Sequence, residues 1–172
     1  MLTTPLSAYA TTLAITRAGG VPVFVDVDAS GLVDLELAER AFEQDRTLRF
    51  FVPVHLYGHA FDLERLERLK ARFDLKIVED CCQAIGAQWA DRSVGSVGQL
   101  SAVSFYPTKN LGVLGDGGAV FTDDQDLDRV CRQLRDYGQT SKYVRDLRGL
   151  SSRRDELHAA IVARGFLPRR AR

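Results

Sequence analysis

The chain has 172 residues, 45% of them hydrophobic and 27% charged, which is typical of a soluble globular protein with one cored domain. Its formal net charge is zero, so nothing supports a general polyanion-binding role such as nucleic-acid binding. No apolar run approaches the length of a membrane span, and the N-terminus lacks the basic and then apolar layout of a signal peptide.

Helices and strands alternate through the first half of the chain. Short polar residues mark helix starts, and continuous apolar runs indicate strands buried in a parallel sheet. The predicted elements are a helix over about 8–18 capped by Ser7, a buried strand over 21–27, a helix over 35–43 capped by Asp34, a strand over 50–56, a helix over 63–73 capped by Asp62, and a strand over 75–79 followed by Asp80.

The second half continues this alternation with more irregular stretches. The elements predicted here are a short helix over 82–87, strands over 102–106 and 119–122, a helix from Asp123 or Asp124 to about 135, a loop over 137–149, and a last helix starting near Ser152. Alternation with short connections predicts right-handed crossovers, and hence an α/β fold with a mostly parallel sheet covered by helices on both faces. We assign residues 1–160 to this domain and residues 161–172, rich in arginine, to a basic disordered tail.

Lys109 lies in the stretch around which the chain is organised. The run 102–106 predicts a buried strand, Pro107 ends it, and a turn then carries the lysine. Four glycines follow within the seven residues 112–118, so the backbone can approach a ligand closely. A lysine in this setting suits a covalent amine nucleophile, although most single lysines are solvated surface charges.

Three other polar residues lie near predicted strand ends, where parallel α/β sheets bind ligands. Asp80 could bind a ribose hydroxyl, a metal or a protonated ring nitrogen, or could simply cap a helix. Gln83 lies three residues further on, so a helical turn would direct it toward the same ligand. Ser104 could bond a phosphate, although a buried serine usually bonds to backbone. Together with Lys109, these residues suit pyridoxal phosphate (PLP), which needs a lysine, an acid at the ring nitrogen and phosphate donors.

The chain resembles the DegT/DnrJ/StrS-type sugar aminotransferases over about residues 4–160. The similar segments match in order and spacing: Ala14–Ile15, Pro22–Asp28, Val52–Gly58, Val78–Ala87, Gly95–Gly98, Ser104–Gly112 and Gly115–Ala119. The resemblance implies a truncated large domain of a fold type I PLP-dependent transferase. It also implies that Lys109 binds PLP covalently, Asp80 pairs with the pyridine nitrogen, Gln83 approaches the ring hydroxyl and Ser104 binds the phosphate.

The resemblance further implies a substrate and partners. The substrate would be a nucleotide-linked keto sugar, the amino donor glutamate or glutamine, and the assembly a cytoplasmic homodimer. The family's Gly/Ser-Thr phosphate-binding segment precedes the first residues here, and its small C-terminal domain is not present. Relatives usually carry Asn at the position of Ser151 and an apolar residue at that of Arg154. We therefore expect this chain alone to lack a complete site, and two alternatives stay open: a truncated or frameshifted remnant, and a nucleotide-binding α/β module.

The remaining polar signals are weaker. Cys81, Cys82 and Cys131 have no metal-ligand spacing and predict free thiols in a reducing compartment; we assign no metal site. The adjacent pair is interpreted as small buried hydrophobic residues. His55, at a strand end, is interpreted as structural rather than catalytic.

Overall fold

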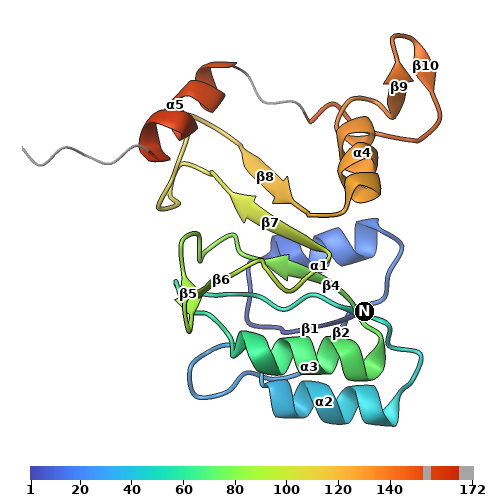
Figure 1. The fold of residues 1–172 in the computed structure, drawn as a ribbon, viewed down its shortest axis with the longest axis vertical. Helices are drawn as coiled ribbons and strands as arrows, with labels where there is room; N and C mark the ends of the chain where they lie inside the picture. The colour runs from blue at the N-terminus through green and yellow to red at the C-terminus, as the bar shows by residue number, and fades with distance from the viewer. Residues whose placement is uncertain (153–155, 167–172) are drawn as a thin grey trace, which may run out of the picture. The chain divides into compact units, whose positions relative to one another are not determined.

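The computed structural model describes residues 1–152 and 156–166 (Figure 1). The chain forms two compact units, one from Met1 to Val103 and one that begins at Ser104. Across the described ranges, no helix combines the length and the apolar character needed to cross a membrane.

The first unit is built on a parallel sheet in the strand order β2-β1-β3-β4-β7. Every neighbouring pair in this order is parallel, as the alternation of strands and helices predicts. A separate antiparallel hairpin is formed by β5 and β6. The strands of the unit are β1 (Leu2–Thr3), β2 (Val23–Phe24), β3 (Phe50–Phe51), β4 (Lys76–Asp80), β5 (Gln88–Trp89), β6 (Arg92–Ser93) and β7 (Leu100–Ser104), whose last residue opens the second unit.

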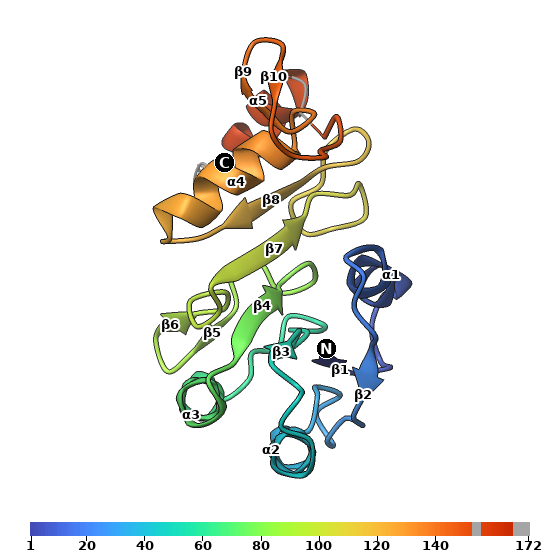
Figure 2. The ribbon, with the colours of Figure 1, turned by 90° about the vertical axis from the view of Figure 1, so that its right-hand side faces the viewer.

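Three helices cover the two faces of this sheet. Figure 2 shows α2 (Leu35–Gln44) and α3 (Leu63–Phe73) on one side of the strands and α1 (Tyr9–Arg17) on the other. This division follows from the strand order: the chain moves one way from β1 to β2 and the opposite way from β2 to β4. Right-handed crossovers in opposite directions place their helices on opposite faces.

The helix starts at α2 and α3 are set by local side-chain caps, as predicted. Asp34 accepts hydrogen bonds from the backbone N–H groups of residues 36 and 37, and Asp62 accepts one from that of Arg65. The core lies between these helices and the sheet, where Phe42 packs edge-on against Phe51 at a ring-centroid distance of 5.5 Å.

The second unit holds β8 (Gly118–Phe121), α4 (Gln125–Leu134) and α5 (Glu156–Phe166), together with a hairpin of β9 (Gln139–Ser141) and β10 (Val144–Arg145). Asp124 caps α4 by accepting from the backbone N–H groups of Asp126 and Leu127, which settles the choice between Asp123 and Asp124.

Four strands differ from expectation. The strand predicted over 50–56 is only β3 (Phe50–Phe51), and the one predicted over 102–106 is β7 (Leu100–Ser104). β1 was not predicted, yet Leu2 and Thr3 are fully buried between β2 and β3, and the Thr3 hydroxyl donates to the Val52 carbonyl at 2.9 Å. The buried strand predicted over 21–27 is the short edge strand β2, and Phe24 is 46% exposed. A strand at the sheet edge has a neighbour on one side only, so its apolar side chains are left partly uncovered.

Several local predictions also need correction. Residues 82–87 form turns rather than a helix, and the predicted loop 137–149 contains the hairpin β9–β10. The N-cap of α1 is Ala8, without a side-chain hydrogen bond, while Ser7 bonds elsewhere. Residues 161–166 continue α5 as helix, where the tail was expected to be disordered. The rest of that tail, and the predicted cap near Ser152–Asp155, extend outside the described residues, so the domain boundary at 160 stays a prediction.

Candidate functional site

Asp80 ends β4, at the carboxyl edge of the parallel sheet. Its Oδ2 accepts a hydrogen bond from the Thr11 hydroxyl at 2.7 Å, and its Oδ1 accepts one from the Cys82 backbone N–H at 3.0 Å. Because no helix follows, Asp80 is not a helix cap. Each of its oxygens keeps a further lone pair for a ligand, since a carboxylate oxygen can accept more than one hydrogen bond.

Thr11 was not foreseen as part of this site. It lies on α1 and is 5% exposed, and its hydroxyl also lies 2.7 Å from the Ser7 hydroxyl. Thr11 and Asp80 are 69 residues apart in the sequence, so no local pattern relates them.

Gln83 follows Asp80 in a turn and is half-buried. Its backbone carbonyl accepts from the Gly58 N–H at 2.9 Å. Within the described ranges its side-chain amide has no hydrogen bond, so the amide is available to a ligand.

Lys109 and Ser104 belong to the second unit. Lys109 lies on a turn after β7, as predicted, and its backbone N–H donates to the Tyr106 carbonyl at 2.9 Å. Ser104 ends β7, and its hydroxyl oxygen accepts from the Tyr106 N–H at 3.2 Å. Because Asp80 and Gln83 belong to the first unit, their convergence with Lys109 on one ligand stays a prediction.

Gly112 is required for the tight turn that carries Lys109. A Cβ atom added to Gly112 would lie 2.6 Å from the Pro107 carbonyl oxygen and 3.0 Å from its carbon, closer than real contacts allow. The clash is with backbone, so it cannot be relieved by a change of rotamer.

We expect Gly112→Ala to destabilise the protein by about 1–3 kcal/mol, the usual range for overpacking. The measurement is urea unfolding followed by circular dichroism. Asn110→Ala, at an exposed position of the same turn, is the control and should change stability by less than about 0.5 kcal/mol. Equal midpoints for the two variants would contradict this role of Gly112.

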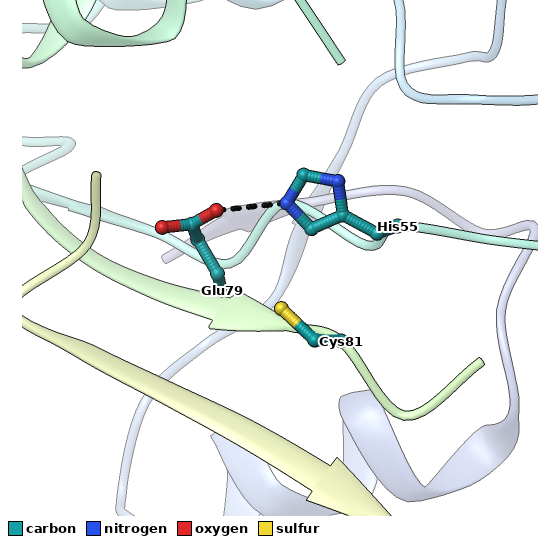
Figure 3. A group of neighbouring side chains, drawn as sticks. All are labelled: His55, Glu79 and Cys81. Carbon is teal, nitrogen blue, oxygen red and sulfur yellow. Dashed lines mark hydrogen bonds and ion pairs between the residues drawn. The ribbon is translucent and has the colours of Figure 1, made fainter. Parts of the chain in front are cut away.

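A buried polar cluster lies beside the candidate site in the first unit (Figure 3). His55 and Glu79 are both fully buried, and the His55 Nε2 lies 2.8 Å from a Glu79 carboxylate oxygen. Glu79 also accepts hydrogen bonds from the backbone N–H groups of Gly95, Val97 and Gly98 at 2.6–2.9 Å. Burial would raise the pKa of Glu79, but these hydrogen bonds, led by the one from His55, outweigh it and hold the pKa below its ordinary value.

This cluster is interpreted as structural rather than metal-binding. Ligand atoms of His55, Glu79 and Cys81 lie within 4.8 Å of one another, but a cation would have to displace the four donors already bound to Glu79. Figure 3 shows the second ring nitrogen of His55 turned away from Glu79, and that atom, Nδ1, has no partner among the described residues. A neutral imidazole that donates from Nε2 leaves Nδ1 as an acceptor, for which a missing partner is less costly than for an N–H.

The buried cysteine beside this cluster is also interpreted as structural. Cys81 is buried, and burial raises the pKa of its thiol well above the ordinary value, with smaller contributions from Glu79 and Asp80. Cys82 and Cys131 are half-buried, and none of the three cysteines forms a disulfide within the part of the chain that the structure describes. The interpretation as a buried hydrophobic residue is therefore confirmed for Cys81, and Cys82 is only partly covered.

Comparison with known proteins identifies the fold. The chain is 46% identical over 166 residues to the dTDP-3-amino-3,4,6-trideoxy-alpha-D-glucose transaminase of Micromonospora megalomicea subsp. nigra, covering 95% of this chain and 44% of that protein. The crystal structure of S. venezuelae DesV matches with a TM-score of 0.88 and 41% identity, over 95% of this chain and 44% of that one. The crystal structure of ntda from Bacillus subtilis, with bound cofactor PMP, matches with a TM-score of 0.85 and 34% identity, over 94% of this chain and 37% of that one.

These matches confirm the predicted fold, the large domain of a fold type I PLP-dependent transferase. The chain spans about 44% of the length of the transaminase it matches, so its similarity concerns that part of the relative. A model of the DegT/DnrJ/EryC1/StrS aminotransferase family matches residues 1–166, almost the whole chain. The chain belongs to the DegT/DnrJ/EryC1/StrS aminotransferase family.

Proposed function

We propose that this chain carries the PLP-binding residues of an aminotransferase that acts on a nucleotide-linked keto sugar. Family membership supports the reaction class, and the name of the dTDP-sugar transaminase supports the substrate class. The observation that carries the proposal for this chain is Asp80, a carboxylate held at both oxygens at the carboxyl edge of a parallel sheet.

The residues present fit PLP in their chemistry. When bound, PLP supplies a protonated pyridine ring that stabilises negative charge on the substrate carbon. The open lone pairs of Asp80 can accept the N–H of such a ring, and the negative charge of the carboxylate keeps that proton in place. The unpaired amide of Gln83 can donate to a ring oxygen.

Lys109 and Ser104 complete the proposed set. The Lys109 amine would hold the cofactor by condensing with its aldehyde, with release of water, and Nζ would carry a proton when it is not so bonded. Ser104 accepts a hydrogen bond from Tyr106 N–H, so its own hydroxyl proton remains available to a phosphate oxygen. We propose glutamate or glutamine as amino donor and a homodimer as the assembly.

Two binding measurements separate this proposal from the two alternatives, a remnant without a site and a nucleotide-binding module. PLP is added to the purified chain, and the visible absorbance of lysine-bound cofactor is followed; a nucleoside diphosphate is then tested by calorimetry. Absorbance that depends on Lys109 supports the aminotransferase site. If the chain shows no such absorbance and binds no nucleotide, it is a remnant without a site. Nucleotide binding without absorbance indicates a nucleotide-binding module.

Asp80→Asn is expected to weaken PLP binding about tenfold while covalent attachment at Lys109 persists. The amide is isosteric but carries no charge to match a protonated ring, and charge-assisted hydrogen bonds are about twice as strong as neutral ones. Dissociation constants come from absorbance titration. Asp91→Asn is the matched control, because Asp91 is exposed and its positive φ of 66° is one that asparagine also tolerates. Equal affinity of Asp80→Asn and wild type would show that Asp80 has another task.

A further inference from the structure

The Thr11 hydroxyl is used differently from that of Thr16, another threonine on α1. The Thr16 hydroxyl donates to the Leu13 carbonyl of its own helix at 3.0 Å, the local contact that helical threonines commonly make. Thr11 instead donates across to Asp80 at the end of β4. It is buried, whereas Thr16 is exposed. This contact ties the helix on one face of the sheet to the acid at the sheet edge.

The hydrogen-bond directions around Thr11 follow from counting protons. A carboxylate accepts hydrogen bonds and cannot donate them, so the single hydroxyl proton of Thr11 is committed to Asp80. The 2.7 Å contact between Ser7 and Thr11 must then have Ser7 as its donor. The result is a directed chain from Ser7 to Thr11 to Asp80, in which each donor polarises the next.

This chain fixes the orientation of the Asp80 carboxylate. Cys82 N–H holds Oδ1 from the backbone, and Thr11 holds Oδ2 from a side chain whose β-branched Cβ restricts rotation within the helix. With one donor on each oxygen, the carboxyl plane cannot turn without breaking a hydrogen bond. The remaining lone pairs of the carboxylate therefore point in a fixed direction, from which a ligand N–H can be accepted.

We propose that Thr11 is a positioning residue for Asp80, with Ser7 as its supporting donor. Its task is to hold the carboxylate in the orientation that accepts an N–H from the ligand ring. This inference rests on the proposed function, because that ligand is PLP. Thr11 itself touches the acid and acts on the cofactor only through it.

The test compares PLP dissociation constants of wild type, Thr11→Val, Thr11→Ser and Thr16→Val. Thr11→Val removes the hydroxyl at nearly constant shape and should weaken PLP binding about tenfold. Thr11→Ser keeps the hydroxyl and should stay within about threefold of wild type. Thr16→Val, on the same helix, should bind as wild type does. Circular dichroism of each cofactor-free variant reports folding, and Ser7→Ala, expected to weaken binding about twofold, serves if Thr11→Val does not fold.

A double-mutant cycle separates positioning from general stability. In the Asp80→Asn background, Thr11→Val should weaken PLP binding by less than twofold, because the group that it orients has lost its charge. A tenfold effect in both backgrounds would overturn the positioning role while leaving the proposed function intact. Unchanged PLP affinity in Thr11→Val would also overturn the positioning role. If Thr11→Val does not fold, unchanged affinity in Ser7→Ala would do the same. Absence of PLP binding in wild type would instead overturn the proposed function, and this inference with it.

Discussion

Lys109→Ala is expected to eliminate the visible absorbance of PLP bound to this protein and to weaken PLP binding by about 100-fold, or ~2.8 kcal/mol. The covalent bond between the lysine amine and the cofactor aldehyde cannot form without Nζ. Lys109 is half-buried on a tight turn, and its backbone N–H is hydrogen-bonded to the Tyr106 carbonyl. A backbone held in this way fixes the point from which the amine reaches, which raises its effective concentration toward a bound aldehyde.

Two further variants sharpen the Lys109 experiment. Lys109→Arg keeps a positive charge, but the guanidinium stays protonated and is not a nucleophile, so the absorbance should be lost as in the alanine variant. Lys142→Ala removes an exposed lysine between β9 and β10, in the same unit, and should leave the absorbance unchanged. Absorbance retained in Lys109→Ala but lost in Lys142→Ala would reassign the nucleophile.

Glu79→Ala is expected to destabilise the protein by about 3 kcal/mol or more, because each buried donor left without its acceptor costs about 1–3 kcal/mol. The substitution leaves His55 and the N–H groups of Gly95, Val97 and Gly98 without their acceptor in a buried place. The loop that carries these N–H groups is held to β4 by the Glu79 carboxylate. Urea unfolding at neutral pH measures the loss. Glu64→Ala, whose carboxylate is 66% exposed, should cost less than about 1 kcal/mol.

The same carboxylate predicts a pH dependence of stability. The pKa of Glu79 in the folded protein lies below its ordinary value of 4.5, so its contribution is fully present above about pH 4.5. As the pH falls from 4.5 through the folded pKa, the contribution is lost. The free energy of unfolding of wild type should therefore decline in that window, and the decline should be smaller in Glu79→Gln. Parallel pH profiles for the two proteins would contradict this assignment.

Much of the fold could be predicted because its signals are local. Asp34, Asp62 and Asp124 cap helices through bonds to residues two or three positions away. The strand leading to Asp80 is marked by the apolar residues Leu75, Ile77 and Val78. β1 was missed because a strand of only two residues is too short to show a periodic pattern. The hairpin of β9 and β10 was missed because its strands are short, polar and exposed.

In the candidate site too, residues with a local signal were predicted and a long-range contact was not. Asp80 and Lys109 were predicted from their positions after strands, but Thr11 contacts Asp80 across 69 residues and left no local signal. Glu79 did carry a local signal, because it is an acid inside a buried strand and such a residue needs buried partners. Neighbouring residues of a strand face opposite sides of the sheet. Glu79 therefore faces the loop 95–98, while Asp80 faces α1.

The most direct test of the account maps where PLP attaches. PLP is added to the purified chain, the adduct is reduced with borohydride, and labelled peptides are identified by mass spectrometry. The chain's other lysines, Lys70, Lys76 and Lys142, compete in the same sample, and the last two are exposed whereas Lys109 is half-buried. We predict that the label is concentrated on Lys109. Label concentrated on the exposed Lys76 and Lys142, with Lys109 unmodified, would contradict the proposed site.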